Sequence, residues 1–154
     1  MEDGKEENNN KEESNNKEES LVSYLKEQFH QEEVDIRTYS PLTLAYIGDA
    51  IYELMIRTLL VDRGNTQVNK LHRRATGLVK AEKQSQMVEI LKQHFTKEEM
   101  QIYKRGRNAK SFTSAKNASI TDYRRATGFE AVMGYLYLEG KYHRMIDLTK
   151  LGLS

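Results

Sequence analysis

The sequence predicts an all-α fold, and three observations support it. Apolar residues recur at three- and four-residue steps in several stretches between residues 40 and 151, which is the spacing of one face of a helix. Helix-start signals precede these stretches, among them Ser40-Pro41 and a capping box that pairs Thr96 with Glu99. No region shows the two-residue alternation that is typical of strands.

The 154 residues suffice for one domain with an appendage. Residues 1–20 repeat a Lys-Glu-Glu unit and carry eight acids against three lysines. Such a segment has too little apolar area to offset the entropy of ordering, so it is predicted to be a disordered acidic tail. We interpret it as a solubilising segment, with weak competition against nucleic acid as the alternative. Residues 21–154 form the predicted domain and have a net charge of +6.

Composition excludes several classes of protein. The chain has no cysteine, so disulfides and thiolate metal sites are ruled out. No apolar run approaches the roughly 18 residues that span a bilayer, and the N-terminus has no apolar signal core. We therefore expect a soluble, cytoplasmic protein.

The first long helix is expected from Ser40 to about residues 62–65, after a marginal helix over residues 21–29. Ser40 is a good N-cap, and Pro41 at the first helical position loses only an amide that has no helical partner. The expected core-facing stripe is Leu44, Ile47, Ile51, Leu54, Met55 and Thr58.

Polar and small residues interrupt this apolar helix. Gly48 costs about 1 kcal/mol relative to alanine inside a helix, which suggests close approach by a neighbouring backbone or a ligand. Asp49 and Glu53 lie four residues apart and therefore point the same way. Asp49 is either a solvated surface residue or part of a functional site.

Three further helices are expected before residue 104. The first begins with Thr66 as cap and ends near Lys80; the second covers residues 81–95; the third follows Thr96 to about Tyr103. The inward residues of the second are Met87, Val88, Ile90 and Leu91. One face of the first is basic and is either solvated or a ridge facing phosphates; its residues are Lys70, Arg73, Arg74 and Lys80.

Residues 104–119 change character and are expected to form a loop. The segment is rich in glycine, serine and lysine, and it has five cations and no acid. It is predicted to bind RNA phosphates, with a merely exposed flexible loop as the alternative. The cations are Lys104, Arg105, Arg107, Lys110 and Lys116.

The last long helix is expected from Thr121, its cap, to Gly140, its left-handed stop, and a short helix over residues 142–151 closes the chain. Glu130 lies beside the apolar stripe of this helix, two residues after Gly128. If this helix packs on the helix from Ser40, Glu130 and Asp49 could meet and hold a hard divalent cation. The four histidines lack metal-ligand spacing, and no Gly-x-Ser-x-Gly or phosphate-binding glycine loop is present.

Two segments carry a resemblance to a known family. Residues 46–54 read Tyr-Ile-Gly-Asp-Ala-Ile-Tyr-Glu-Leu, which resembles the signature of the ribonuclease III catalytic domain. Residues 127–138 read Thr-Gly-Phe-Glu-Ala-Val-Met-Gly-Tyr-Leu-Tyr-Leu and resemble the family's second acidic motif. The basic stretch Lys-Arg-Gly-Arg-Asn-Ala-Lys-Ser, and the absence of a double-stranded-RNA-binding domain, are similar to the Mini-ribonuclease III group. The resemblance covers about residues 34–153.

The resemblance implies a homodimeric endoribonuclease that cleaves double-stranded RNA with Mg²⁺ and acts in maturation of the large-subunit (23S) ribosomal RNA precursor. Asp49 and Glu130 are the expected catalytic metal ligands, with Glu53 as a weaker candidate for the metal site, acting from beyond the direct ligands. Tyr46 matches the aromatic position at the dimer interface. A ribosomal-protein helper is a further candidate partner, and no membrane is expected. The expected RNA contacts are Arg73, Arg74, Arg105, Arg107, Lys110 and Lys116.

The match also departs from the family pattern. Ala45 and Thr127 stand where typical ribonuclease III enzymes carry two further carboxylates, and Leu42 replaces an acid, so the number of metal ions is left open. The alternative function is a catalytically silent RNA-binding or ribosome-associated module on the same fold.

Overall fold

The computed structural model describes residues 20–110 and 119–154. The predicted acidic tail, apart from Ser20, and Lys116 lie outside these residues. The described residues contain helices and no β-strand, which confirms the all-α prediction. None of the helices in this part of the chain is long and apolar enough to cross a membrane.

The chain forms two units, divided between Glu32 and Glu33. The described part of the first contains α1 (Leu21–Gln28), which begins with a capping box at Ser20. The second unit, Glu33–Ser154, contains the functional candidates. After a short 3₁₀ helix, Ile36–Thr38, its helices are α2 (Pro41–Val61), α3 (Val68–Val79), α4 (Ala81–Leu91), α5 (Lys97–Asn108), α6 (Ile120–Leu138) and α7 (Tyr142–Gly152).

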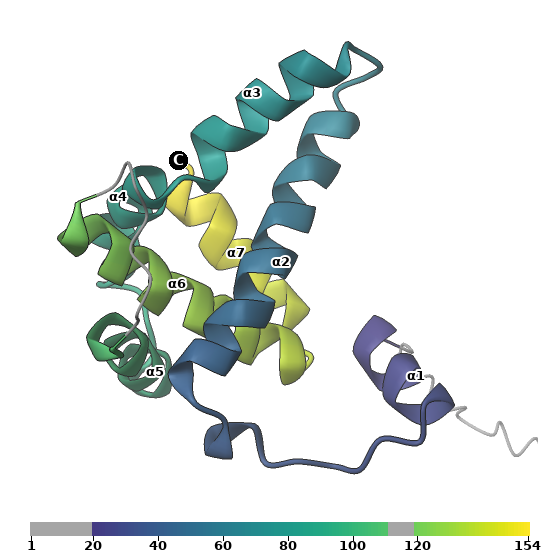
Figure 1. The fold of residues 1–154 in the computed structure, drawn as a ribbon, viewed down its shortest axis with the longest axis vertical. Coiled ribbons are helices and arrows are strands. Elements are labelled where there is room, and N and C mark those ends of the chain that lie inside the picture. Colours follow the sequence, from purple (N-terminus) through teal and green to yellow (C-terminus); the bar gives the residue numbers. More distant parts are fainter. Residues whose placement is uncertain (1–19, 111–118) are drawn as a thin grey trace, which may run out of the picture. The chain divides into compact units, whose positions relative to one another are not determined.

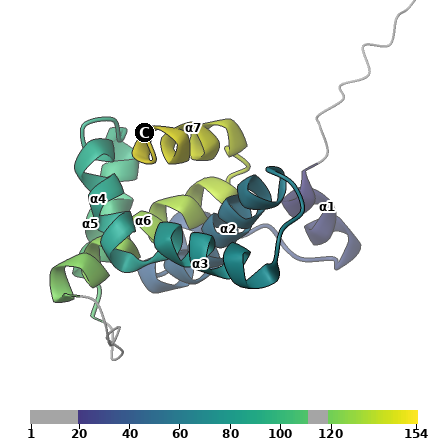
Figure 2. The ribbon, with the colours of Figure 1, turned by 90° about the horizontal axis from the view of Figure 1, so that it is seen from above.

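Helix α6 is the centre of the second unit, and α2, α4, α5 and α7 all pack against it. Figure 1 shows α2 crossing α6, and Figure 2 shows α6 between α7 and the pair α2–α3. Most of α6 is buried, from Ala126 to Leu136 apart from Glu130. The Tyr52 ring meets the Phe129 ring edge to face, with the centroids 5.1 Å apart.

Helix α2 begins as predicted, with the Ser40 hydroxyl accepting a hydrogen bond from the Thr43 amide at 3.2 Å. The predicted core-facing stripe was only partly right. Leu44 is buried, but Leu54 and Thr58 are exposed, and the buried stripe instead follows steps of three and four through Ala45, Gly48, Tyr52, Ile56 and Leu60. Because α2 has apolar residues on two faces, spacing alone did not identify the face that meets α6.

Three other helix boundaries differ from the predictions. Gln67, not Thr66, precedes α3, and its side chain makes no cap hydrogen bond. Ser119, not Thr121, caps α6 by accepting from the Asp122 amide. Helix α4 ends at Leu91 rather than at Phe95, and Ile90 lies at the surface.

Helix α5 differs most from expectation. Its capping box at Thr96 and Glu99 is present, but the helix continues to Asn108, so Lys104, Arg105 and Arg107 are helical and not part of a loop. The reason is packing: a Cβ on Gly106 would lie 2.9 Å from the Gly128 Cα. This glycine serves a close helix crossing rather than a turn.

Candidate nuclease site

Two glycines bring the backbones of α2 and α6 into direct contact. A Cβ on Gly48 would lie 1.7 Å from the Glu130 carbonyl oxygen, and a Cβ on Gly134 would lie 2.0 Å from the Leu44 carbonyl oxygen. Any larger residue at either position would force the helices apart. The close approach predicted at Gly48 is therefore made by a neighbouring backbone.

This crossing brings together the two predicted acids, Asp49 of α2 and Glu130 of α6. Glu130 is largely enclosed, and burial raises the pKa of its carboxyl to about 8, with the Asp49 charge as the second cause. The pKa of Asp49 is also raised, first by partial desolvation and then by the Glu53 charge, although Asp49 remains open to solvent. The two carboxyl groups thus lie within electrostatic range of each other, and their mutual repulsion favours a cation between them.

Glu53 takes a different role from the other two acids. It forms an ion pair with Arg57, one turn later on α2, at 2.8 Å. Its charge still raises the pKa of Asp49. Glu53 therefore lies near the acid pair while its own carboxylate is engaged by a cation of the same helix.

Gln84 belongs to the site and was not identified from the sequence. It lies on α4, is 1% exposed, and donates from Nε2 to the Val79 carbonyl at 2.8 Å. Its amide also acts as a hydrogen-bond partner that lowers the pKa of Glu130 against the effect of burial. Its Oε1 has no hydrogen-bond partner among the described residues. A sequence signal existed, because Gln84 lies three and four residues before the buried Met87 and Val88 and so shares their face.

The donor set fits a hard divalent cation. The carboxylates of Asp49 and Glu130 lie near each other. Among the described residues, no group of three or more histidine, aspartate or glutamate side chains is placed to hold a metal ion, so a site here would have two protein carboxylates. Mg²⁺ gives up its waters reluctantly and is commonly bound through one or two carboxylates. Asp49 and Glu130 therefore suit a Mg²⁺ ion that keeps several waters; their role as ligands remains a prediction.

The predicted RNA-contacting cations occupy two helices. Arg73 and Arg74 are exposed on α3, and Arg105 is exposed on α5. Arg107 is half-buried, with its guanidinium carbon 5.6 Å from the centre of the Tyr103 ring. Lys110 follows α5 and is exposed, whereas Lys116 lies outside the described residues.

The predicted dimer residue Tyr46 is 82% exposed and lies outside the buried stripe of α2. Its ring is therefore available to a partner.

Comparisons with known proteins agree with this architecture. A model of the ribonuclease III domain matches residues 42–141. The Mini-ribonuclease 3 of Clostridium tetani is 49% identical over 132 residues, which cover 85% of this chain and 86% of that protein. The Mini-ribonuclease 3 of Enterococcus faecalis is 50% identical over 116 residues, 74% of this chain and 88% of that protein. The crystal structure of a Fusobacterium nucleatum protein superposes with a TM-score of 0.71 at 31% identity, covering 79% of this chain and 97% of that one.

Proposed function

Because the chain belongs to the ribonuclease III domain family and is an endoribonuclease, we propose that it cleaves double-stranded RNA in a Mg²⁺-dependent reaction. The observation that carries this proposal is the convergence of Asp49 and Glu130 at the α2–α6 crossing. Burial and the Asp49 charge raise the pKa of Glu130, and partial desolvation and the Glu53 charge raise the pKa of Asp49. The alternative of a catalytically silent module gives no reason for two acids to be held together at this energetic cost.

Each residue of the site has a separate proposed role. Asp49 and Glu130 would hold the ion, and Gly48 sets their separation by allowing backbone contact. Gln84 holds the Glu130 carboxyl from the protein side. A Mg²⁺ ion bound there would supply an activated water and would stabilise negative charge on the leaving oxygen of a phosphodiester.

The RNA would be held by its backbone. Duplex RNA hides its base edges in a deep, narrow groove, so recognition rests on shape, phosphates and 2′-hydroxyls. The proposed phosphate-binding side chains are Arg73, Arg74, Arg105, Arg107, Lys110 and Lys116. Replacing any one of these cations with alanine should reduce the log–log salt slope of duplex binding by roughly 0.7–0.9.

We propose a homodimer formed through the exposed face of α2. Leu54 and Leu59 of α2 and Ile146 of α7 are each about half-exposed and line an apolar pocket of about 670 Å³. An apolar surface of this kind on a soluble protein commonly marks an interaction site. Tyr46 lies on the same helix and is exposed to a partner.

The proposed substrates are duplex stems of the large-subunit (23S) ribosomal RNA precursor, processed in the cytoplasm. This part of the proposal rests on the resemblance to Mini-ribonuclease III, and a ribosomal-protein helper remains a prediction of that resemblance. Cleavage of a transcript of the precursor's terminal stem, mapped by primer extension, tests the substrate separately from the activity.

The decisive experiment is cleavage of a long RNA duplex across a Mg²⁺ titration, with a chelator control. Asp49→Asn and Glu130→Gln should abolish cleavage and leave duplex binding within a few-fold of the unsubstituted protein. Glu139→Gln, an exposed acid just after α6, is the matched control and should cleave normally. Normal turnover by either Asp49→Asn or Glu130→Gln would refute the assignment of the acid pair.

A further inference from the structure

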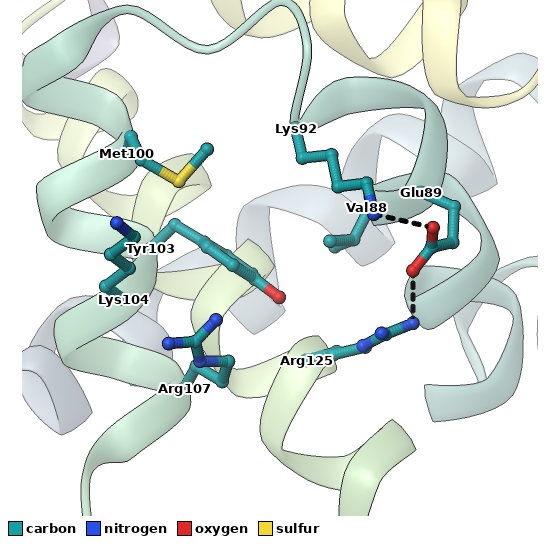
Figure 3. Close-up of a pocket in the computed structure, with 8 residues that line it drawn as sticks. All are labelled: Val88, Glu89, Lys92, Met100, Tyr103, Lys104, Arg107 and Arg125. Carbon is teal, nitrogen blue, oxygen red and sulfur yellow. Dashed lines mark ion pairs between the residues drawn. The ribbon is translucent and has the colours of Figure 1, made fainter.

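A second, basic pocket lies between α4, α5 and the start of α6. It has a volume of about 260 Å³ and is lined by four cations and one acid. The charged and polar groups around it are Glu89, Lys92, Tyr103, Lys104, Arg107 and Arg125. Figure 3 shows Tyr103 reaching from α5 into the space between Arg107 and Arg125. Three helices thus place an excess of three positive charges around one hollow.

The cations are arranged rather than scattered. Lys92 and Arg125 converge on the single carboxylate of Glu89, with Lys92 at 2.9 Å. Arg107 is held over the Tyr103 ring and has no carboxylate partner among the described residues. Burial raises the pKa of the Tyr103 phenol, and the charges of Arg107 and Arg125 act in the opposite direction, so both guanidinium groups lie near that hydroxyl.

The Glu89 carboxylate indicates what the pocket accepts. Two cations already bind a planar anion there, and Arg107 supplies a further set of N–H donors nearby. Guanidinium groups bind phosphate oxygens in the same forked geometry that they use for carboxylates. The neutral Tyr103 hydroxyl is a donor as well.

We propose that this pocket is a phosphate-binding site, distinct from the acid pair, in which Arg107 and Arg125 bind the anion. The Glu89 carboxylate competes with the phosphate for Lys92 and Arg125. The inference deepens the proposed function, because an RNA phosphate seated here would anchor the substrate away from Asp49 and Glu130. Arg107 was expected to contact RNA from a loop; here it acts from a helix, together with Arg125, which the sequence did not single out.

The first test is calorimetric titration of the full chain with inorganic phosphate, without metal and at low ionic strength. Arg107→Ala and Arg125→Ala should each weaken phosphate binding by roughly tenfold, since each removes a charge-assisted hydrogen bond. The control is Arg63→Ala, which removes an exposed arginine of equal charge outside the pocket and should leave the affinity unchanged.

The second test uses a substitution that should strengthen phosphate binding instead of weakening it. Glu89→Gln should tighten phosphate binding several-fold, because it removes a like charge and releases Lys92 and Arg125. The control, Glu82→Gln, makes the same change at an exposed position of α4 outside the pocket. It should leave phosphate binding unchanged. Equal effects of Glu89→Gln and Glu82→Gln, or of Arg125→Ala and Arg63→Ala, would overturn the proposal. Circular dichroism confirms that each variant is folded.

The source of the phosphate is resolved with two RNA duplexes, one with 5′-phosphate ends and one with 5′-hydroxyl ends. If Arg107→Ala and Arg125→Ala weaken binding to both equally, the pocket takes a backbone phosphate. Weaker binding to the 5′-phosphate duplex alone identifies a terminal phosphate, and a loss confined to inorganic phosphate identifies a free anion. Because no step requires cleavage, failure here leaves the nuclease assignment standing, and failure of cleavage leaves this site standing.

Discussion

Folding strongly alters the ionisation of the Glu130 carboxyl. Its pKa is about 8 in the folded protein against an ordinary 4.5, because it is buried beside Asp49. The folded state therefore keeps a proton that the unfolded chain releases. The resulting stability is fully present below pH 4.5 and is lost as the pH rises through 8.

We expect the melting temperature of the chelator-treated protein to fall between pH 5 and pH 9. Glu130→Gln should flatten this fall, whereas Glu139→Gln should not. Mg²⁺ should raise the melting temperature more at pH 9 than at pH 5, because a cation binds the ionised pair and not the protonated one. Differential scanning fluorimetry measures all three, and a Mg²⁺ effect independent of pH would contradict the metal-ligand role.

Gln84 offers a second prediction at the scale of the residue. Gln84→Met keeps an unbranched side chain of similar length and removes the amide that lowers the pKa of Glu130. The variant should need a few-fold more Mg²⁺ for half-maximal binding at pH 7. The difference should shrink at pH 9, where Glu130 is ionised in both proteins. Calorimetric Mg²⁺ titration at the two pH values is the measurement, and a difference that does not depend on pH would indicate a purely structural role.

At the scale of the element, the α2–α6 crossing depends on the absence of a side chain. Gly48→Ala would place a methyl group 1.7 Å from the Glu130 carbonyl oxygen, so the free energy of unfolding should fall by about 3 kcal/mol or more. Gly77→Ala is the control, because a Cβ there meets nothing within 4 Å. It should raise helix stability by about 0.5–1 kcal/mol. Urea denaturation compares the two, and a mild effect at Gly48 would mean that the helices cross less closely.

The helices themselves were largely predictable from local signals, since caps such as Ser40 and the Thr96–Glu99 box act over a few residues. Local signals did not predict which neighbouring helix each helix face packs against. Helix α2 is apolar on two sides, so its inward stripe was assigned partly to exposed Leu54. Gly106 was predicted to lie in a loop, although it allows α5 to continue against Gly128. The acid pair was predicted because each acid lies one or two residues after a glycine on a mostly apolar helix. Gln84 belongs to a third helix and was missed.

At the scale of the whole molecule, the exposed apolar face of α2 and α7 predicts self-association. Sedimentation should give a mass near twice the 17.9 kDa chain. Leu54→Asp introduces a charge into this face and should yield monomers, because burying an unpaired carboxylate opposes association. Val68→Asp, an exposed apolar position of α3 outside that face, should remain dimeric. A monomeric unsubstituted protein at micromolar concentration would contradict the dimer.

The glycine contact between α2 and α6 has a further consequence for how this protein tolerates change. The approach of the two backbones that carry Asp49 and Glu130 is set by peptide atoms in contact, which have the same dimensions whatever side chains surround them. Core substitutions on a helix that carries neither acid nor Gln84, such as substitutions of the buried Leu148 in α7, should change the stability of the fold more than the approach of α2 to α6. We therefore expect thermal stability and catalytic turnover to be separable, so that a heat-resistant version should be obtainable by redesigning core positions that contact neither acid nor Gln84.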